Sequence, residues 1–138
     1  MKRKVALLLL GCIILSCFCV PVSASTEIDY GVYRWNNIAF VSTGLTFNGR
    51  SANYSAIITG ADEVNNITAS AVLYFKNSDG DWVEIPMDWT YEVTDSELVI
   101  SEDFRGVIGR EYKVELSATV YMNGYGESIS KTSTKVCQ

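Results

Sequence analysis

The clearest pattern in the chain is a two-residue alternation over residues 112–122. Apolar side chains, among them Tyr112, Leu116 and Met122, occupy every second position, and polar or charged side chains such as Lys113 stand between them. An alternation with this period is typical of a β-strand with one face on a hydrophobic core and the other in water. The stretch therefore predicts a long strand whose even-numbered side chains face the core.

Shorter stretches with the same period, separated by turn sequences such as Asn48-Gly49, run along the rest of the chain. No stretch has a helical period, and residues 89–93 read only as a short continuation of a strand. About seven antiparallel strands with regularly spaced turns predict an all-β fold of the immunoglobulin or fibronectin III type, a two-sheet sandwich rather than a barrel. The predicted strands span residues 38–47, 50–59, 67–76, 81–87, 97–101, 112–122 and 127–136.

The amino terminus has the composition of a secretion signal. Residues 2–4 are basic, residues 5–20 form an uncharged apolar run, and Val22-Ser23-Ala24 matches a small-residue cleavage site. A lipid anchor through Cys17 is the alternative, because residues 14–17 loosely resemble a lipobox. We expect a secreted, extracellular protein with a signal peptide over residues 1–24, an N-terminal arm over 25–37 and a β-sandwich domain over 38–138.

Cleavage at that site changes both the charge and the cysteine content. Eight basic and sixteen acidic side chains remain, a net side-chain charge of −8. A surface of that sign repels phosphate backbones and anionic head groups, which argues against nucleic-acid partners and against membrane binding after signal cleavage. Cys137 becomes the sole cysteine, so it is either a thiol on a frayed tail or the site of a disulfide that links two chains as a dimer.

Several short motifs resemble fibronectin type III domains. Residues 109–114 resemble the tyrosine-corner entry to the penultimate strand of that family, residues 71–84 its central hairpin and residues 123–128 its final hairpin. The resemblance implies that the Tyr112 ring packs in the core, that its hydroxyl bonds a backbone group of the preceding crossover, and that Gly109 precedes it by three residues.

More broadly, the chain resembles small secreted immunoglobulin-like proteins of Gram-positive bacteria, many of which have no known function. Its second predicted strand has Tyr54 or Ile58 where the fibronectin type III family carries a tryptophan. The resemblance implies a fold and no specific function.

The chain contains no histidine, which excludes histidine-assisted nucleophilic catalysis and the usual zinc sites. Two carboxylate pairs remain as formal acid–base candidates, Glu84 with Asp88 and Glu102 with Asp103. A domain of this size has little room for the cleft that such a pair needs, so we expect solvated surface acids, no catalytic residue and no enzyme.

The turn sequence at residues 77–81 is a candidate calcium site, because it carries amide, hydroxyl and carboxylate oxygens. In an EF-hand register, Phe75 and Pro86 would fall on the first and twelfth ligand positions, which excludes that loop. A looser site made from the turn carboxylates stays open beside the plain hairpin turn that we expect. The prediction is accordingly no metal and no cofactor.

Aromatic side chains are the one feature that points to a ligand. Trp82, Tyr74 and Tyr121 lie on the polar faces of predicted strands, and exposed rings on a β-sandwich are how many carbohydrate-binding modules stack on sugars. The structural alternative is that Trp82 and Tyr74 cover one another across their hairpin. The sequence predicts a non-enzymatic extracellular or cell-envelope interaction module with a protein or glycan partner, and a carbohydrate-binding module is the alternative.

Overall fold

The structure is a computed structural model that describes residues 35–138. The predicted signal peptide, the alternative anchor at Cys17 and residues 25–34 of the predicted arm lie outside the described residues. Within residues 35–138, no helix is long and apolar enough to cross a membrane. The strands are β1 (Ile38–Asn48), β2 (Ser51–Gly60), β3 (Val64–Lys76), β4 (Trp82–Ile85), β5 (Thr90–Val93), β6 (Glu97–Arg105), β7 (Glu111–Met122) and β8 (Tyr125–Val136).

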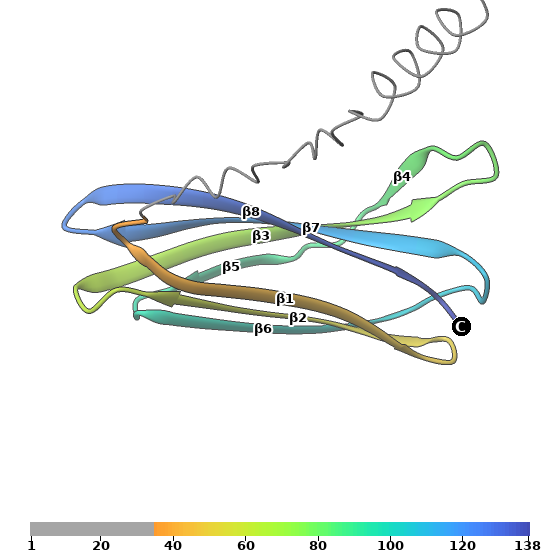
Figure 1. Cartoon of the computed structure of the whole chain (residues 1–138), viewed down its shortest axis with the longest axis horizontal. Coiled ribbons are helices and arrows are strands. Elements are labelled where there is room, and N and C mark those ends of the chain that lie inside the picture. The colour runs from red at the N-terminus through yellow and green to blue at the C-terminus, as the bar shows by residue number, and fades with distance from the viewer. Residues whose placement is uncertain (1–34) are drawn as a thin grey trace, which may run out of the picture. The chain divides into compact units, whose positions relative to one another are not determined.

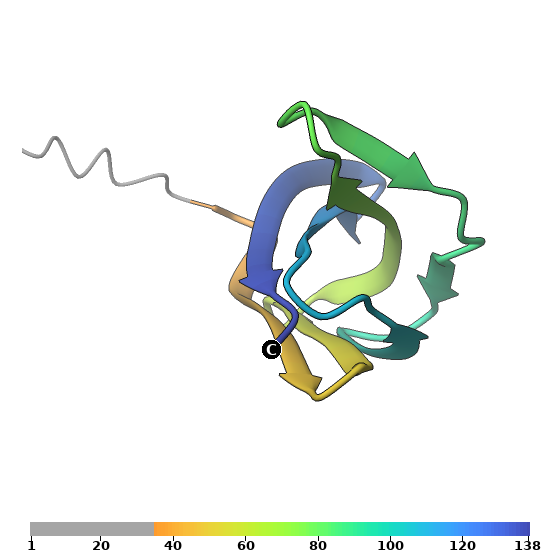
Figure 2. The ribbon, with the colours of Figure 1, turned by 90° about the vertical axis from the view of Figure 1, so that its right-hand side faces the viewer.

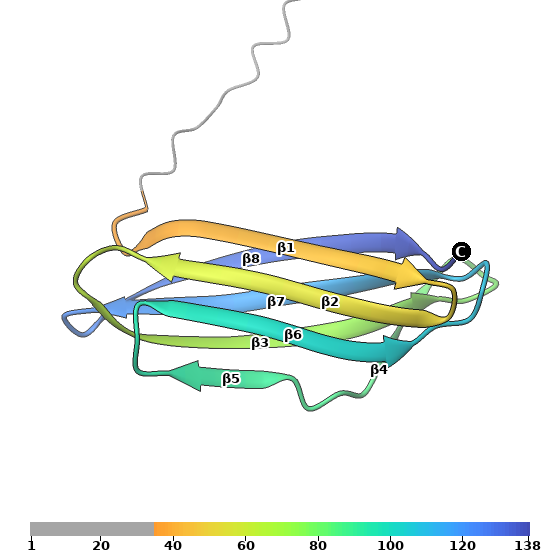
Figure 3. The same ribbon diagram turned by 90° about the horizontal axis from the view of Figure 1, so that it is seen from below.

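The strands form two antiparallel sheets that stack face to face (Figures 1 and 3). The smaller sheet has the order β1-β2-β6, and the larger has the order β4-β3-β7-β8, with β5 also paired to β3. The predicted all-β sandwich is therefore confirmed, with eight strands instead of about seven. The six long strands, β1, β2, β3, β6, β7 and β8, run between the same two ends of the sandwich, so the loops that join them gather at those ends (Figure 3).

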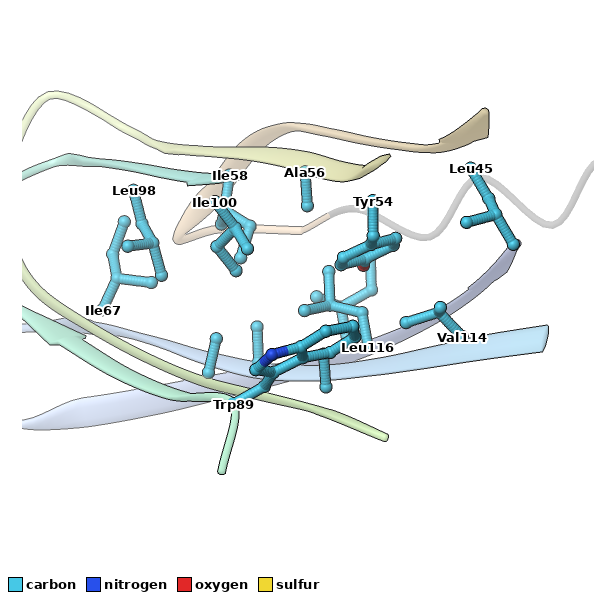
Figure 4. Close-up of a cluster of buried hydrophobic side chains, with 14 of the residues drawn as sticks. Leu45, Tyr54, Ala56, Ile58, Ile67, Trp89, Leu98, Ile100, Val114 and Leu116 are labelled. Atoms are coloured by element: carbon cyan, nitrogen blue, oxygen red, sulfur yellow. The ribbon is translucent and has the colours of Figure 1, made fainter. Parts of the chain in front are cut away.

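The central strand β7 follows the alternation seen in the sequence. Val114 and Leu116 are fully buried, whereas Lys113 and Glu115 point outward and are half-buried. β7 lies between β3 and β8, so each of its inward side chains has a neighbour on both sides. Figure 4 shows Leu116 and Val114 of the larger sheet facing side chains of the smaller one.

Aromatic rings fill the core toward the end that holds the C-terminus. Tyr54 stacks on Trp89, with ring centroids 6.1 Å apart and an interplanar angle of 9° (Figure 4). Phe104 lies against Trp89 and Tyr112, and Phe47 lies against both Phe104 and Tyr112. Such offset and tilted pairs are favoured by the quadrupoles of the rings and join the two sheets at this end.

Several predicted boundaries were wrong. β3 begins at Val64, so the loop predicted over residues 60–66 shrinks to residues 61–63. The strand predicted over residues 81–87 is only four residues long and ends at Ile85, directly before Pro86, which has no N–H to donate to a ladder. Its expected core face is thinly covered, since Val83 is exposed, and β4 leaves the body of the sandwich in Figure 1.

The side where β1 meets β8 is closed by polar contacts between the sheets. The Glu127 carboxylate accepts the backbone N–H groups of Asn37, at 2.8 Å, and Ile38, at 3.2 Å. The buried Asn37 side chain donates to the carbonyl oxygens of Val120 and Tyr125. Asn37, which the sequence assigned to the arm, therefore packs as part of the folded domain.

Cys137 corrects the prediction of a frayed tail. Its side chain is 0% exposed, its thiol donates to the carbonyl oxygen of Gly49 at 3.3 Å, and its backbone exchanges hydrogen bonds with Gly109 and Arg110. The tail lacks apolar alternation, and neighbours distant in sequence bury its penultimate residue. The intermolecular disulfide stays a prediction, and it would require Cys137 to leave this position.

Candidate functional site

The predicted aromatic residues Tyr74 and Trp82 lie together on the outer face of the larger sheet. Tyr74 on β3 is paired with Lys113 on β7, and Trp82 on β4 is paired with Lys76 on β3. Both rings are half-buried rather than open to solvent. Cross-strand register therefore sets a lysine beside each ring.

Lysine side chains cover these rings. The Lys113 ammonium lies 4.5 Å from the centroid of Tyr74 and 4.9 Å from that of Trp82, and the Lys76 ammonium lies 5.4 Å from the centroid of Trp82. Lys113 is also paired with Glu115 at 2.6 Å. Cation–π contacts of this kind are favourable for the fold, and they occupy ring faces that a sugar would need.

The electrostatic surroundings of Tyr74 follow from this cluster. Desolvation raises the pKa of Tyr74 above its usual range, and the carboxylates of Glu115 and Glu84 raise it further, against the opposing charge of Lys113. The Tyr74 phenol therefore loses its proton only at a higher pH than an isolated tyrosine does.

Tyr121, the third predicted aromatic, lies far from the other two. It is paired with Asn66 near the start of β3, whereas Tyr74 is paired with Lys113, eight positions earlier on β7. Eight strand residues span about 26 Å. The surface between them is an open trough of about 440 Å³ lined by short side chains, Thr68, Ser70, Ser117, Thr119, Ser128 and Ser130 among them. The three aromatics therefore do not form one continuous row.

A second hollow lies at the end of the sandwich that faces the viewer in Figure 2, which we call the C-terminal end. This end of the sandwich holds the β1–β2 turn, the β3–β4 turn, the β6–β7 loop and the carboxyl end of β8. The hollow has a volume of about 600 Å³. Its lining residues are Lys76, Asn77, Ser78, Val107, Ile108, Gly109, Arg110, Glu111 and Val136.

The side chains at this hollow combine exposed aliphatic groups with cations. Val107 is 51% exposed, Ile108 58% and Val136 39%. The Arg110 guanidinium lies 4.6 Å from the centroid of the Phe75 ring, and the Lys76 ammonium is paired with Glu111 at 3.0 Å. Exposed apolar side chains that gather in one patch are a feature of interaction surfaces.

The tyrosine corner holds the loop that presents Val107 and Ile108. The buried Tyr112 hydroxyl accepts the N–H of Val107 at 2.9 Å, as the fibronectin type III resemblance implied. Gly109 has a φ of 84°, which an L side chain rarely adopts, and its N–H donates to the Cys137 carbonyl oxygen at 2.8 Å. Gly106 allows close packing, because an added Cβ would lie 2.7 Å from the Phe47 ring.

The carboxylates of the two candidate pairs are exposed or engaged in hydrogen bonds. Glu102 and Asp103 are neighbours on β6 and point to opposite faces of its sheet. Glu102 points inward and accepts the Tyr91 hydroxyl at 2.9 Å, while Asp103 points outward and accepts the Asn53 amide. Glu84 and Asp88 are both exposed.

The turn at residues 77–81 is stabilised from within. The Asn77 side-chain oxygen accepts the N–H groups of Asp79, at 3.0 Å, and Asp81, at 2.8 Å. The Asn77 side-chain oxygen therefore serves as the acceptor of an Asx turn. Within residues 35–138, no three histidine, cysteine, aspartate or glutamate side chains gather closely enough to hold a metal ion.

Comparisons with known proteins do not assign the chain to a family. No protein-family model matches it, and no curated protein matches it. Among solved structures, the β-glucuronidase of Parabacteroides merdae resembles 71% of the chain with a TM-score of 0.39 and 11% sequence identity. The chain spans 13% of the length of that enzyme. A likeness this weak carries no statement about activity.

The sequence identified the aromatic cluster but missed the C-terminal hollow. Residues 77–78, 107–111 and 136 are brought together only by the topology, and no local period marks them. One signal was available: Val107 and Ile108 are apolar residues between two glycines, outside every predicted strand. Apolar residues in a loop cover no sheet face. Because binding residues are often carried by loops, such residues indicate a candidate contact site.

Proposed function

We propose that this protein is a secreted, non-enzymatic β-sandwich of the fibronectin III or immunoglobulin-like type that works as an extracellular interaction module. The strand order β1-β2-β6 against β4-β3-β7-β8 supports this type, as does the Tyr112 corner at the start of β7. The absence of histidine and the outward or hydrogen-bonded positions of the carboxylates support a function without catalysis.

The interaction is proposed to use the C-terminal end. The observation that carries this proposal is the group of exposed aliphatic side chains, Val107, Ile108 and Val136, around one hollow. Loops held by a rigid sandwich are the usual place for binding residues. The corner hydrogen bond and the Cys137 backbone contacts fix this loop, so little conformational entropy is lost when a partner binds.

The experiment measures binding of the purified, labelled protein to the cells that secrete it. The double variant Val107→Asp/Ile108→Asp places charges in the proposed contact, so we expect binding to fall about tenfold or more. Val99→Asp is the matched control, because Val99 is 63% exposed on the outer face of the smaller sheet. Equal binding by the wild type and the double variant, both folded, would overturn the proposal.

Glycan binding through Trp82, Tyr74 and Tyr121 is the second candidate. Its support is that Tyr74 and Trp82 lie side by side on an outer sheet face; against it stand the lysine-covered rings and the distant Tyr121. Trp82→Ala tests it on a glycan array: loss of a signal that the wild type gives would favour it, and a silent wild type would reject it.

Secretion is tested separately by expressing the full chain in a bacterial host. We expect the protein in the culture medium with Ser25 as its first residue, because the cleavage motif ends at Ala24. A lipid-modified, cell-bound product beginning at Cys17 would establish the anchored alternative.

A further inference from the structure

Charge is distributed unevenly between the two ends of the sandwich. Residues 35–138 contain seven lysine and arginine side chains. Six of them lie at the C-terminal end of the sandwich, either in its loops or within three residues of the strand end that borders those loops. The seventh, Lys131, lies midway along β8. The six are Arg50, Lys76, Arg105, Arg110, Lys113 and Lys135.

The opposite end, which we call the acidic end, has the reverse composition. It combines the β2–β3 loop, the β5–β6 loop and the β7–β8 turn, and lies on the left in Figure 3. Within the described residues it has six carboxylates and no cation. These are Asp62, Glu63, Glu92, Asp95, Glu97 and Glu127.

At the C-terminal end the charges balance, and some cations have no ion-pair partner. Its six cations stand beside six carboxylates, Asp79, Asp81, Glu84, Asp103, Glu111 and Glu115, the last of which is paired with Lys113. Within residues 35–138 the only ion pairs are Lys76 with Glu111 and Lys113 with Glu115. Arg50, Arg105, Arg110 and Lys135 therefore have no ion-pair partner in the described part. Of the two ends of the sandwich over residues 35–138, this is the one where an acidic surface would meet cations without net repulsion.

The two ends also complement each other in apolar contacts. Tyr125, beside the β7–β8 turn, is 80% exposed. The turn itself is a tight two-residue connection, in which Asn123 has a φ of 53° and Gly124 a φ of 83°. An aromatic side chain on a rigid turn is a suitable anchor for a pocket edged by aliphatic groups, such as the hollow lined by Val107 and Ile108.

We propose that the C-terminal hollow of one molecule binds the acidic end of a second copy of this chain. Tyr125 of one copy enters the hollow, and Asp62, Glu63 and Asp95 approach Arg105 and Arg110 of the other. The inference rests on the proposed function, because it names the partner of the same hollow. Since two different surfaces meet, the contact repeats head to tail and forms chains or rings rather than a two-fold dimer.

Sedimentation velocity of the purified protein, expressed from the full chain, tests this contact. In about 20 mM salt the sedimentation coefficient rises with protein concentration, and in about 0.5 M salt the rise is lost, because exposed charges are then screened. A wild type that stays monomeric in low salt at millimolar concentration overturns the proposal.

Charge reversal tests which surfaces meet. Arg105→Glu/Arg110→Glu and Asp62→Lys/Glu63→Lys each abolish the concentration dependence, and an equimolar mixture of the two variants restores it. Lys131→Glu changes charge away from both ends and leaves association unchanged. Tyr125→Ser keeps every charge and weakens association about tenfold. Persistence of association in both reversed variants overturns the contact.

The two proposals fail in different ways. If the wild type is monomeric but Val107→Asp/Ile108→Asp loses cell binding, the partner is not a second copy of this chain. The hollow then still binds a partner on the cell. If an unrelated acidic peptide binds the hollow while the wild type is monomeric, the same conclusion holds. If the double variant neither loses cell binding nor changes sedimentation, both proposals are wrong.

Discussion

Two tyrosines in the same core, Tyr112 and Tyr54, are buried equally well but differ in the hydrogen bonding of their hydroxyls. The Tyr112 hydroxyl accepts the Val107 N–H at 2.9 Å. The Tyr54 hydroxyl is buried and has no hydrogen-bond partner within residues 35–138. A ring buries apolar area in either case, whereas a hydroxyl stabilises the fold only when it has a partner. Thus Tyr112 fixes a loop, and Tyr54 mainly fills space beside Trp89.

The largest expected effect on stability is that of truncating Leu116, which belongs to the same core as both tyrosines. Leu116 is fully buried in the centre of β7, so Leu116→Ala should lower the free energy of unfolding by about 2–5 kcal/mol. Denaturation in urea measures it. A loss below about 1 kcal/mol would mean that this face of β7 does not carry the core, and the comparison of the tyrosines would lose its basis.

At alkaline pH, the two phenols whose pKa is raised in the fold, Tyr54 and Tyr91, should make the free energy of unfolding depend on pH. Burial raises the pKa of Tyr54 to about 12, from an ordinary value of 10.0. Burial also raises the pKa of Tyr91, and its hydrogen bond to Glu102 adds to that shift. The folded protein keeps these protons after the unfolded chain has lost them, so their contribution to stability is complete below pH 10.

Above pH 10 that contribution declines. Each raised phenol lowers the free energy of unfolding by at most about 1.4 kcal/mol per pH unit, for Tyr54 until about pH 12. Urea denaturation at several pH values measures the slope, and Tyr54→Phe should reduce it. An unchanged slope in Tyr54→Phe would mean that another group governs alkaline unfolding.

The sequence predicted those parts of the fold whose cause is local. The alternation in β7 identified Leu116 and Val114 as core residues, and the glycine three residues before Tyr112 indicated the corner. Contacts between distant segments were not predictable in this way. Cys137 is buried by Gly49 and Gly106 from other loops. The hollow at Val107 exists only because the β3–β4 turn, the β6–β7 loop and the end of β8 meet at one end.

The candidate site shows the same limit. Exposed faces of strands were predicted correctly for Tyr74 and Trp82, since they follow from alternation. The covering of both rings by Lys113 depends on the register between β3, β4 and β7, which an alternating pattern alone does not determine. Tyr121 was grouped with them by face, although register sets it at the other end of the sheet.

Tyr112→Phe should have an intermediate effect. The substitution keeps the ring among Phe47 and Phe104 and removes only the acceptor of the Val107 N–H. We expect the free energy of unfolding to fall by about 1 kcal/mol or somewhat more. Hydrogen exchange at Val107 should also accelerate. An unchanged melting temperature and an unchanged exchange rate would show that the corner does not hold the loop.

The smallest effect, and the sharpest comparison, is expected for Tyr54→Phe. The variant removes a hydroxyl that has no partner within the described residues while the ring stays stacked on Trp89. Because burying an unpaired hydroxyl costs free energy, the variant should be as stable as the wild type or more stable by up to about 1 kcal/mol. Tyr112→Phe, measured in the same urea series, is the matched control. Equal destabilisation of the two variants would mean that both hydroxyls have partners, and the distinction between a bonded and a space-filling tyrosine would fail.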